Sequence, residues 1–251
     1  GIRTFETSSR NTLDLTAGVV RRTIAGRSYT MFGFNGQYPG PMLRVPQGAH
    51  VVVRFHNALP LPSTVHWHGL RLDARFDGVP GLSQPAVEPG ESFTYHLVFP
   101  DGGIFWYHPH VREDIQQDLG LYGNIFVQPS RPDAWGPVHR EECLILDDLL
   151  VGDDGLVPWG RDEPTHAAMG RFGNLLRVTG EPDWRLQVRQ GEVVRLFLTN
   201  VSNTRTFNLS FGAGARLKVV GSDLGNFARE SWAESVVIGP AERYVVEVRF
   251  E

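Results

Sequence analysis

Four of the nine histidines in this chain form two pairs, each with one residue between the partners. His66 and His68 make the first pair, and His108 and His110 make the second. In a β-strand, residues i and i+2 point to the same face, so each pair presents two imidazoles to one side, about 6–7 Å apart at Cα. Because adjacent strands lie about 4.8 Å apart, two neighbouring strands can bring all four imidazoles into one patch.

A patch of four imidazoles is typical of a metal site. All-imidazole ligation suits copper, zinc, iron or nickel, and copper(II) binds most tightly in the Irving–Williams order. Two rigid pairs bind neighbouring ions more easily than they close one tetrahedral site, although four ligands permit that too. The alternative is that two exposed strands carry solvated or hydrogen-bonded histidines without a metal. Two pairs beside Trp67, Trp106 and Tyr107 favour the metal site.

The surrounding segments have the pattern of β-strands. Apolar and polar residues alternate over 51–56 and 92–99, and 193–198 and 243–250 are similar. Asn-Gly, Pro-Gly and Asp-Gly turn signals lie between such segments. The best helix candidate is 112–119, which is followed by a glycine as a stop signal. We therefore predict an all-β fold of Greek-key sandwich or barrel domains.

Length and composition narrow the function further. The 251 residues allow one to two domains at about 100–200 residues each. A net charge of −4 gives no basic footprint, so nucleic acid is not expected as a main partner. No apolar run approaches the roughly 20 residues of a membrane span, and none is expected. One cysteine excludes an internal disulfide framework and a Cys-rich zinc module.

Two pairs of segments repeat along the chain. Residues 44–57 (RVPQGAHVVVRFHN) are similar to 187–200 (QVRQGEVVRLFLTN), and 88–93 (EPGESF) are similar to 239–244 (GPAERY). Since both matches occur in the same order, they indicate two copies of one β unit.

This repeat predicts the domain boundary. The proline-rich segment 129–137 separates the copies, and we predict a first domain over 1–132 and a second over 133–251. At the repeat positions of His66 and His68, the second copy carries Leu209 and Phe211. Copper ligands are therefore expected in the first domain and not in the second.

The second copy is also shorter than the first. The first continues past Phe99 to about Val127, whereas the second stops at Glu251, just past the counterpart of Phe99. A β-sandwich without its last strands would have an open edge. We therefore expect the second domain to be truncated and the chain to be part of a longer protein.

Four motifs follow one another in the first domain: YPGP at 38–41, HWHG at 66–69, WYHPH at 106–110 and GLYG at 120–123. In this order they resemble the multicopper oxidases, which include laccases, ascorbate oxidase and cuprous oxidases. The second domain is similar to that family more weakly, through the QG, GSD and PAER segments at 190–191, 221–223 and 240–243. The resemblance is to the N-terminal two-domain portion of a laccase-like, three-domain member.

The resemblance implies tandem cupredoxin-like domains and a trinuclear copper cluster. By the motif match, His66 would ligate the type 2 copper, and His68, His108 and His110 would ligate the type 3 pair. In the family, the other cluster ligands and the type 1 copper site lie in a third domain. This sequence contains no His-Cys-His motif, so the third domain is expected as a missing partner.

The resemblance also implies an activity. The family couples one-electron oxidation of phenolic, aromatic or metal-ion substrates to four-electron reduction of O2 to water, usually outside the cytoplasm. We expect the chain alone to be inactive. Asp77 lies where similar enzymes place a carboxylate near the cluster, which suggests a catalytic role as a proton relay or as an orienter of a ligand. The alternative is that Asp77 is a turn residue of its Asp-Gly sequence.

Two other functions are compatible with the same fold. A non-enzymatic copper-binding or structural protein is the main alternative, and the four retained histidines disfavour it. A copper nitrite reductase is disfavoured, because it needs a type 1 site and Cys143 has no flanking histidines. Cys143 lies in an apolar strand and is expected to be buried and unreactive. The remaining histidines are expected to be structural: His50, His56, His96, His139 and His166.

Overall fold

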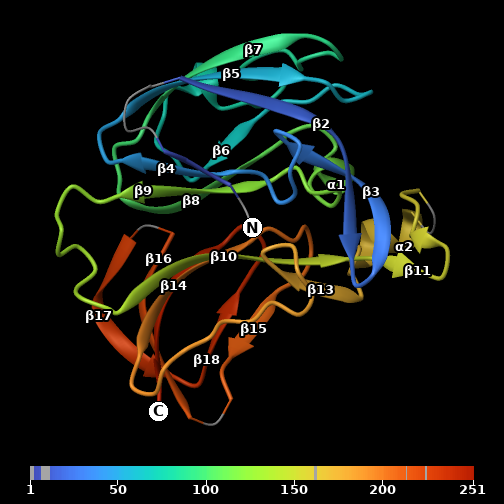
Figure 1. Cartoon of the computed structure of the whole chain (residues 1–251). Coiled ribbons are helices and arrows are strands. Elements are labelled where there is room, and N and C mark those ends of the chain that lie inside the picture. The colour runs from blue at the N-terminus through green and yellow to red at the C-terminus, as the bar shows by residue number, and fades with distance from the viewer. Residues whose placement is uncertain (1–2, 7–11, 161–162, 213, 224) are drawn as a thin grey trace. The chain divides into compact units, whose positions relative to one another are not determined.

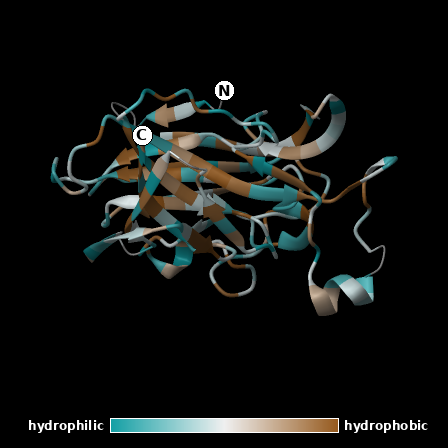
Figure 2. Cartoon of the chain, turned by 90° about the horizontal axis from the view of Figure 1, so that it is seen from below, coloured by the Kyte–Doolittle hydropathy of each residue, from teal (hydrophilic) through white to brown (hydrophobic). Residues whose placement is uncertain are grey.

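Two units follow each other along the chain, Gly1–Ser130 and Arg131–Glu251, and each consists mainly of β-strands (Figure 1). The computed structural model describes residues 3–6, 12–160, 163–212, 214–223 and 225–251. In Figure 2, the strands carry most of the hydrophobic brown colour. The prediction of an all-β fold with sandwich domains is confirmed. Within the described part of the chain, no helix is long and apolar enough to cross a membrane.

The first unit contains a sheet of five strands and a sheet of four. In spatial order, the five strands are β1 (Thr4–Glu6), β4 (Met42–Pro46), β9 (Gly123–Gln128), β8 (Gly103–His108) and β6 (His66–His68). The four strands are β3 (Arg27–Phe34), β2 (Thr12–Ile24), β5 (His50–Asn57) and β7 (Ser92–Val98). In β5, buried Val51, Val53 and Phe55 alternate with more exposed neighbours, as the sequence pattern predicts.

Both glycines of the GLYG motif are required by tyrosine packing. The Tyr107 hydroxyl donates a hydrogen bond to the Pro41 carbonyl at 2.6 Å. A Cβ on Gly123 would overlap that hydroxyl, and a Cβ on Gly120 would overlap the Tyr38 ring. The YPGP and GLYG motifs thus enclose the tyrosine that precedes His108 in the chain.

The second unit is built around a sheet of six strands. Their spatial order is β13 (Leu175–Val178), β10 (Arg140–Leu149), β14 (Val193–Asn200), β19 (Arg243–Phe250), β16 (Ala215–Ser222) and β17 (Gly225–Ala233). The smaller elements are the pair β15 (Phe207–Ser210) and β18 (Ser235–Ile238), the pair β11 (Val151–Gly152) and β12 (Gly155–Leu156), and helix α2 (Glu163–Met169).

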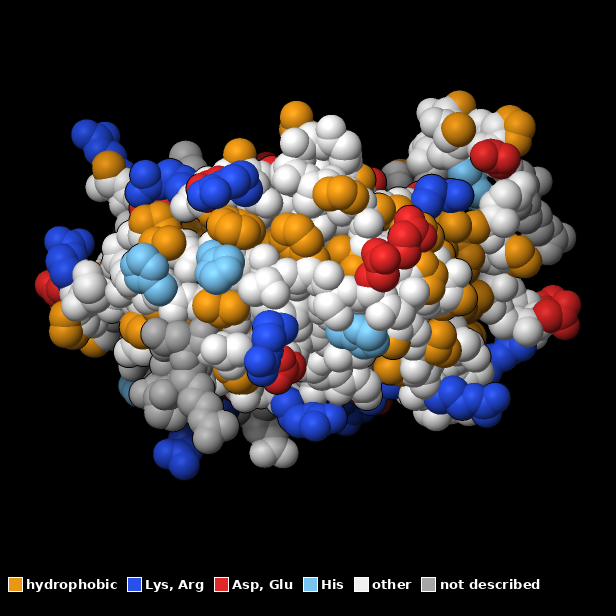
Figure 3. All heavy atoms as spheres, turned by 90° about the horizontal axis from the view of Figure 1, so that it is seen from above, with side chains coloured by type: hydrophobic (Ala, Val, Ile, Leu, Met, Phe, Trp, Pro, Cys, Tyr) orange, Lys and Arg blue, Asp and Glu red, His pale blue; other side chains and the backbone are white. Residues whose placement is uncertain are grey.

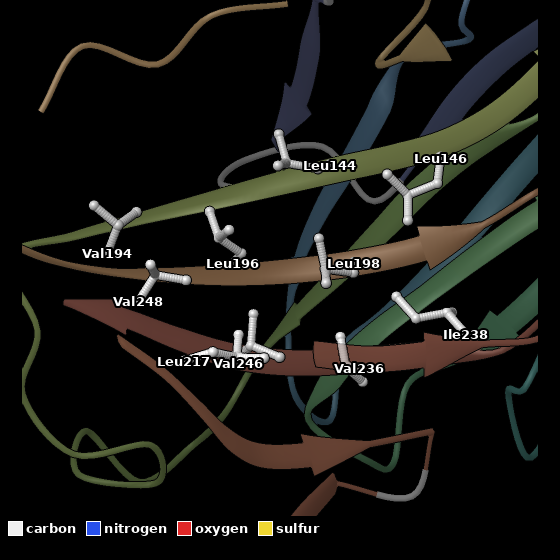
Figure 4. Packing of buried hydrophobic residues seen from close by; sticks show 10 residues of the cluster. All are labelled: Leu144, Leu146, Val194, Leu196, Leu198, Leu217, Val236, Ile238, Val246 and Val248. Atoms are coloured by element: carbon white, nitrogen blue, oxygen red, sulfur yellow. The ribbon is translucent and has the colours of Figure 1, made fainter. Parts of the chain in front are cut away.

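Aliphatic side chains from the six-stranded sheet and from β18 form the core of the second unit. Figure 4 shows side chains of β10, β14, β16 and β19 gathered with Val236 and Ile238 of β18. Leu209 and Phe211 pack against this cluster. The positions that match the HWHG histidines in the repeat therefore contribute to an apolar core.

Two local expectations differ from the structure. The helix predicted over 112–119 is shorter, because α1 spans Glu113–Gln116 and the chain then continues in turns to Gly120, whose φ is +112°. Cys143 is only partly buried. Its neighbour Leu144 on β10 points into the core, so the alternation of the strand turns Cys143 to the opposite face.

Candidate metal centre

The antiparallel pairing of β6 with β8 brings the two histidine pairs together. His66 lies opposite His108, Trp67 lies opposite Tyr107, and His68 lies opposite Trp106. Because side chains alternate along a strand, His66, His68 and His108 share one face of the sheet. The spacing of the pairs in the sequence predicts this arrangement.

The imidazole nitrogens of three histidines converge. One ring nitrogen each of His66, His68 and His108 lies within 4.8 Å of the others. His108 Nε2 is 3.4 Å from His68 Nδ1, so these two atoms lie directly beside each other. His110 follows β8, lies outside this group of three, and has its ring centroid 5.2 Å from that of His66.

Hydrogen bonds fix which nitrogen is available for a metal. The Nδ1 atoms of His66 and His108 each lie 2.8 Å from a backbone carbonyl, of Asp77 and Pro109 respectively. Carbonyl oxygens only accept hydrogen bonds, so each Nδ1 donates and each Nε2 keeps its lone pair. This is the arrangement in which metal-ligating histidines are usually held.

Burial favours the neutral form of His66 and His108. Loss of hydration lowers the pKa of His108 well below its usual value, and the neighbouring His66 and His68 lower it further. Burial also lowers the pKa of His66, although its contacts with Asp77 oppose the shift. Neutral imidazole is the form that binds metal, so a metal does not have to displace protons from these rings.

Aromatic rings pack around the strands that carry the histidines. The Trp106 ring stacks on His108, with centroids 4.2 Å apart and planes at 22°, and it also contacts His68 at 4.9 Å. On the opposite face of the sheet, Trp67 and Tyr107 are fully buried, with centroids 5.8 Å apart. These rings exclude water from two sides of the strands that carry the histidines.

Asp77 contacts His66 with its backbone and its carboxylate. It follows the short helix η1 (Ala74–Phe76), and its Oδ1 lies 3.3 Å from His66 Nδ1. Its side chain is 37% exposed, so the carboxylate touches both the histidine and solvent. Gly78, with φ +77°, approaches the Val65 carbonyl so closely that a Cβ would overlap it. The Asp-Gly sequence therefore forms a turn, and that turn places Asp77 on His66.

Sequence reasoning missed Glu113 and Gln116. The Glu113 carboxylate lies 2.7 Å from His110 Nδ1. The fully buried Gln116 accepts a hydrogen bond from Ser63 Oγ at 2.7 Å and donates one to the Pro62 carbonyl at 2.9 Å. Glu113 stands three residues after His110, but His110 precedes the helix, so helical i,i+3 spacing does not predict this contact. Gln116 carried no signal either, because its partners are distant in the sequence.

The other histidines lie away from the cluster or at the surface. Figure 3 views the molecule from the side on which β5 and β7 lie in Figure 1, and it shows histidines exposed among charged side chains. His50 and His96 are exposed on these strands. His56 Nδ1 lies 3.0 Å from Ser92 Oγ, and His139 Nδ1 accepts a hydrogen bond from the Val193 amide at 3.0 Å.

Known proteins that are similar to this chain include multicopper oxidases and copper resistance proteins. A family model described as multicopper oxidase matches residues 17–132. Copper resistance protein A of Pseudomonas syringae pv. tomato is 37% identical over 140 residues, which cover 56% of this chain and 22% of that protein. Multicopper oxidase mco of Staphylococcus aureus is 27% identical over 224 residues, which cover 87% of this chain and 48% of that protein.

Solved structures match over nearly the whole chain. A multi-copper oxidase from Pseudomonas thermotolerans superposes with a TM-score of 0.85 at 35% identity, covering 96% of this chain and 59% of that one. The fold and the histidine cluster define a metal-binding β-sandwich protein, and the chain belongs to the multicopper oxidase family. Membership implies copper as the metal. The chain spans about half the length of the mco relative and about a fifth of copper resistance protein A.

Proposed function

We propose that this chain forms the part of a laccase-like multicopper oxidase that contributes half of its trinuclear copper cluster. The convergence of His66, His68 and His108, with the Nδ1 atoms of His66 and His108 already engaged, carries the proposal. The donor set fits copper, because it consists of neutral, fixed imidazoles. The family match supplies the identity of the metal.

The roles of individual residues follow the family motifs. His66 would ligate the type 2 copper, and His68, His108 and His110 would ligate the type 3 pair. All four belong to the proposed cupredoxin domain 1–132, while domain 133–251 would hold none of the cluster ligands. The remaining ligands and the type 1 copper would come from a third cupredoxin domain, and the location would be extracytoplasmic.

Bound copper would supply the one-electron redox chemistry for reducing O2 with four electrons and four protons to two waters. The chain itself would orient the ligands and move protons. The hydrogen bonds of His66 and His108 would hold their Nε2 atoms toward the copper, and Trp106 would keep water from their flank. The Asp77 carboxylate, in contact with solvent and with His66, would pass protons toward the cluster. The electrons would come from phenols, aromatic amines or metal ions.

The test compares copper content and oxygen uptake in the whole protein. With a phenol as reductant, the protein should consume one O2 for every four electrons donated, and His66→Ala and His108→Ala should each remove copper and oxygen uptake. His50→Ala, at an exposed histidine of β5, is the matched control and should keep both. Normal copper content and uptake in both cluster variants would contradict the proposal.

A further inference from the structure

His110 differs from its neighbours in what holds its ring. The Nδ1 atoms of His66 and His108 lie closest to backbone carbonyls, at 2.8 Å each. The Nδ1 of His110 instead lies 2.7 Å from a side-chain carboxylate oxygen, Oε1 of Glu113. The contact that holds Nδ1 of His110 is therefore made by a replaceable side chain.

The turn at Arg112 brings Glu113 next to His110. Arg112 adopts a left-handed conformation, with φ +44° and ψ +57°, which turns the chain sharply before α1 begins at Glu113. A non-glycine residue in this region costs about 1–3 kcal/mol, and the surrounding structure must compensate for it. The turn places the first side chain of α1 next to the histidine three residues before it.

Helix α1 is fixed to the segment that leads into β6. Its Gln116 is fully buried and bonds to Ser63 and to the Pro62 carbonyl. The backbone N–H of His110 donates to Thr64 Oγ1 at 3.1 Å. Since Ser63 and Thr64 directly precede Val65 and His66, the same contacts hold both histidine-bearing segments in register.

A carboxylate on Nδ1 has a defined effect on a ligating histidine. It accepts the Nδ1 proton, selects the tautomer with a free Nε2, fixes the rotation of the ring and raises the basicity of the ligand. His110 needs this more than His108 does, because its side chain is 37% exposed whereas His108 is packed under Trp106.

We propose that Glu113 is the positioning residue for His110: it holds the Nδ1–H and aims Nε2 at the copper cluster. This inference rests on the proposed function, in which His110 is a copper ligand. The competing role for Glu113 is to provide negative charge at the start of α1. Asp114 shares that first turn, but its carboxylate binds Arg112 at 2.8 Å, so Asp114→Asn is the matched control.

The first experiment uses the metal-free chain. Nitrogen-15 NMR of the imidazoles should show His110 as the Nδ1–H tautomer. Glu113→Ala should shift it toward the Nε2–H tautomer, and Glu113→Gln, which keeps an oxygen acceptor, should shift it less. Asp114→Asn should leave it unchanged. A His110 tautomer that is the same in Glu113→Ala and in the parent would overturn the proposal, and this readout needs no copper.

The second experiment measures copper(II) affinity with the same proteins. Loss of such a partner typically weakens metal binding or activity about 10–100-fold, which is the loss expected for Glu113→Ala. Glu113→Gln should lose less, and Asp114→Asn should stay within about twofold of the parent. Circular dichroism and thermal melting should confirm that each variant is folded.

The controls separate the two proposals. If His66→Ala and His108→Ala leave copper affinity unchanged, the proposed function fails, whereas the tautomer measurement still tests the Glu113 contact. If those variants lose copper but Glu113→Ala retains full affinity, the positioning role of Glu113 alone is wrong.

Discussion

Trp106 stacks on His108, with ring centroids 4.2 Å apart and ring planes inclined by 22°. The two residues are i and i+2 on β8, so both point to one face of the sheet. The same indole also contacts His68 on the neighbouring strand, at 4.9 Å. One buried ring therefore contacts a histidine from each of the two motifs. The same side chain contributes to the packing of the sheet and to the positions of two cluster histidines.

Replacing this indole should destabilise the first unit. Trp106 is 1% exposed, and truncating a buried tryptophan to alanine costs about 3–5 kcal/mol. Trp106→Ala should lower the free energy of unfolding by that amount in urea denaturation, whereas Trp106→Phe should lose less. Trp232→Ala, at a tryptophan that is 54% exposed, should cost less than about 1 kcal/mol. Equal losses at the two sites would contradict the packing described for Trp106.

The glycine next to Tyr107 should not tolerate a methyl group. A Cβ on Gly123 would overlap the Tyr107 hydroxyl and ring, and overpacking a core costs about 1–3 kcal/mol. Gly123→Ala should therefore lower the melting temperature. Gly212→Ala is the control, because no heavy atom of the described residues, apart from its chain neighbours, lies within 4 Å of its Cβ position. A Gly123→Ala protein as stable as the control would show that the two tyrosine-enclosing motifs are not packed as described.

Stability of the metal-free protein should fall in mild acid. The usual histidine pKa of 6.5 applies to the unfolded chain, whereas burial lowers the pKa of His66 and His108 in the folded state. Below about pH 6.5 the unfolded state then binds more protons than the folded state, so the free energy of unfolding decreases as the pH falls. The slope is at most about 1.4 kcal/mol per pH unit for each histidine.

Urea unfolding between pH 5 and 8 in the presence of a chelator measures this dependence. His108→Gln should show a shallower slope than the parent, and the exposed control His50→Gln should show the parent slope. A His108→Gln protein with an unchanged slope would mean that His108 does not carry the acid sensitivity.

The Asp77 carboxylate should matter for turnover in the whole enzyme. Asp77→Asn keeps the backbone carbonyl that binds His66 and the turn at Gly78, but it removes the titratable group. Oxygen uptake should become slower and its pH profile should change, while copper content stays the same. Unchanged turnover with an unchanged pH profile would remove the proton-relay role and leave Asp77 as a turn residue.

Local spacing was sufficient to predict much of the fold and the centre of the site. The i, i+2 spacing of the histidines predicts a shared face, and β6 and β8 provide it for His66, His68 and His108, whereas His110 lies beyond the end of β8. Alternation likewise predicts the buried face of β5. These features depend on periods of two residues, which a single sequence displays directly.

Contacts between distant segments were not predictable in this way. Gln116 binds Pro62 and Ser63 across 54 and 53 residues, and no periodicity relates them. Helix α1 is shorter than its apolar spacing suggests, since it ends at Gln116 and the chain continues in turns to Gly120. Cys143 illustrates the same limit, because an apolar strand does not reveal which of its two faces is the more buried.

The central claim is that imidazoles of the two His-x-His pairs bind copper. X-ray absorption spectroscopy of the copper-loaded protein tests it most directly, with the His66→Ala/His108→Ala double variant as the comparison. The account predicts nitrogen scatterers near the roughly 2.0 Å typical of metal–imidazole bonds, with imidazole outer-shell scattering that is lost in the double variant. An identical spectrum and copper content in parent and double variant would contradict the account.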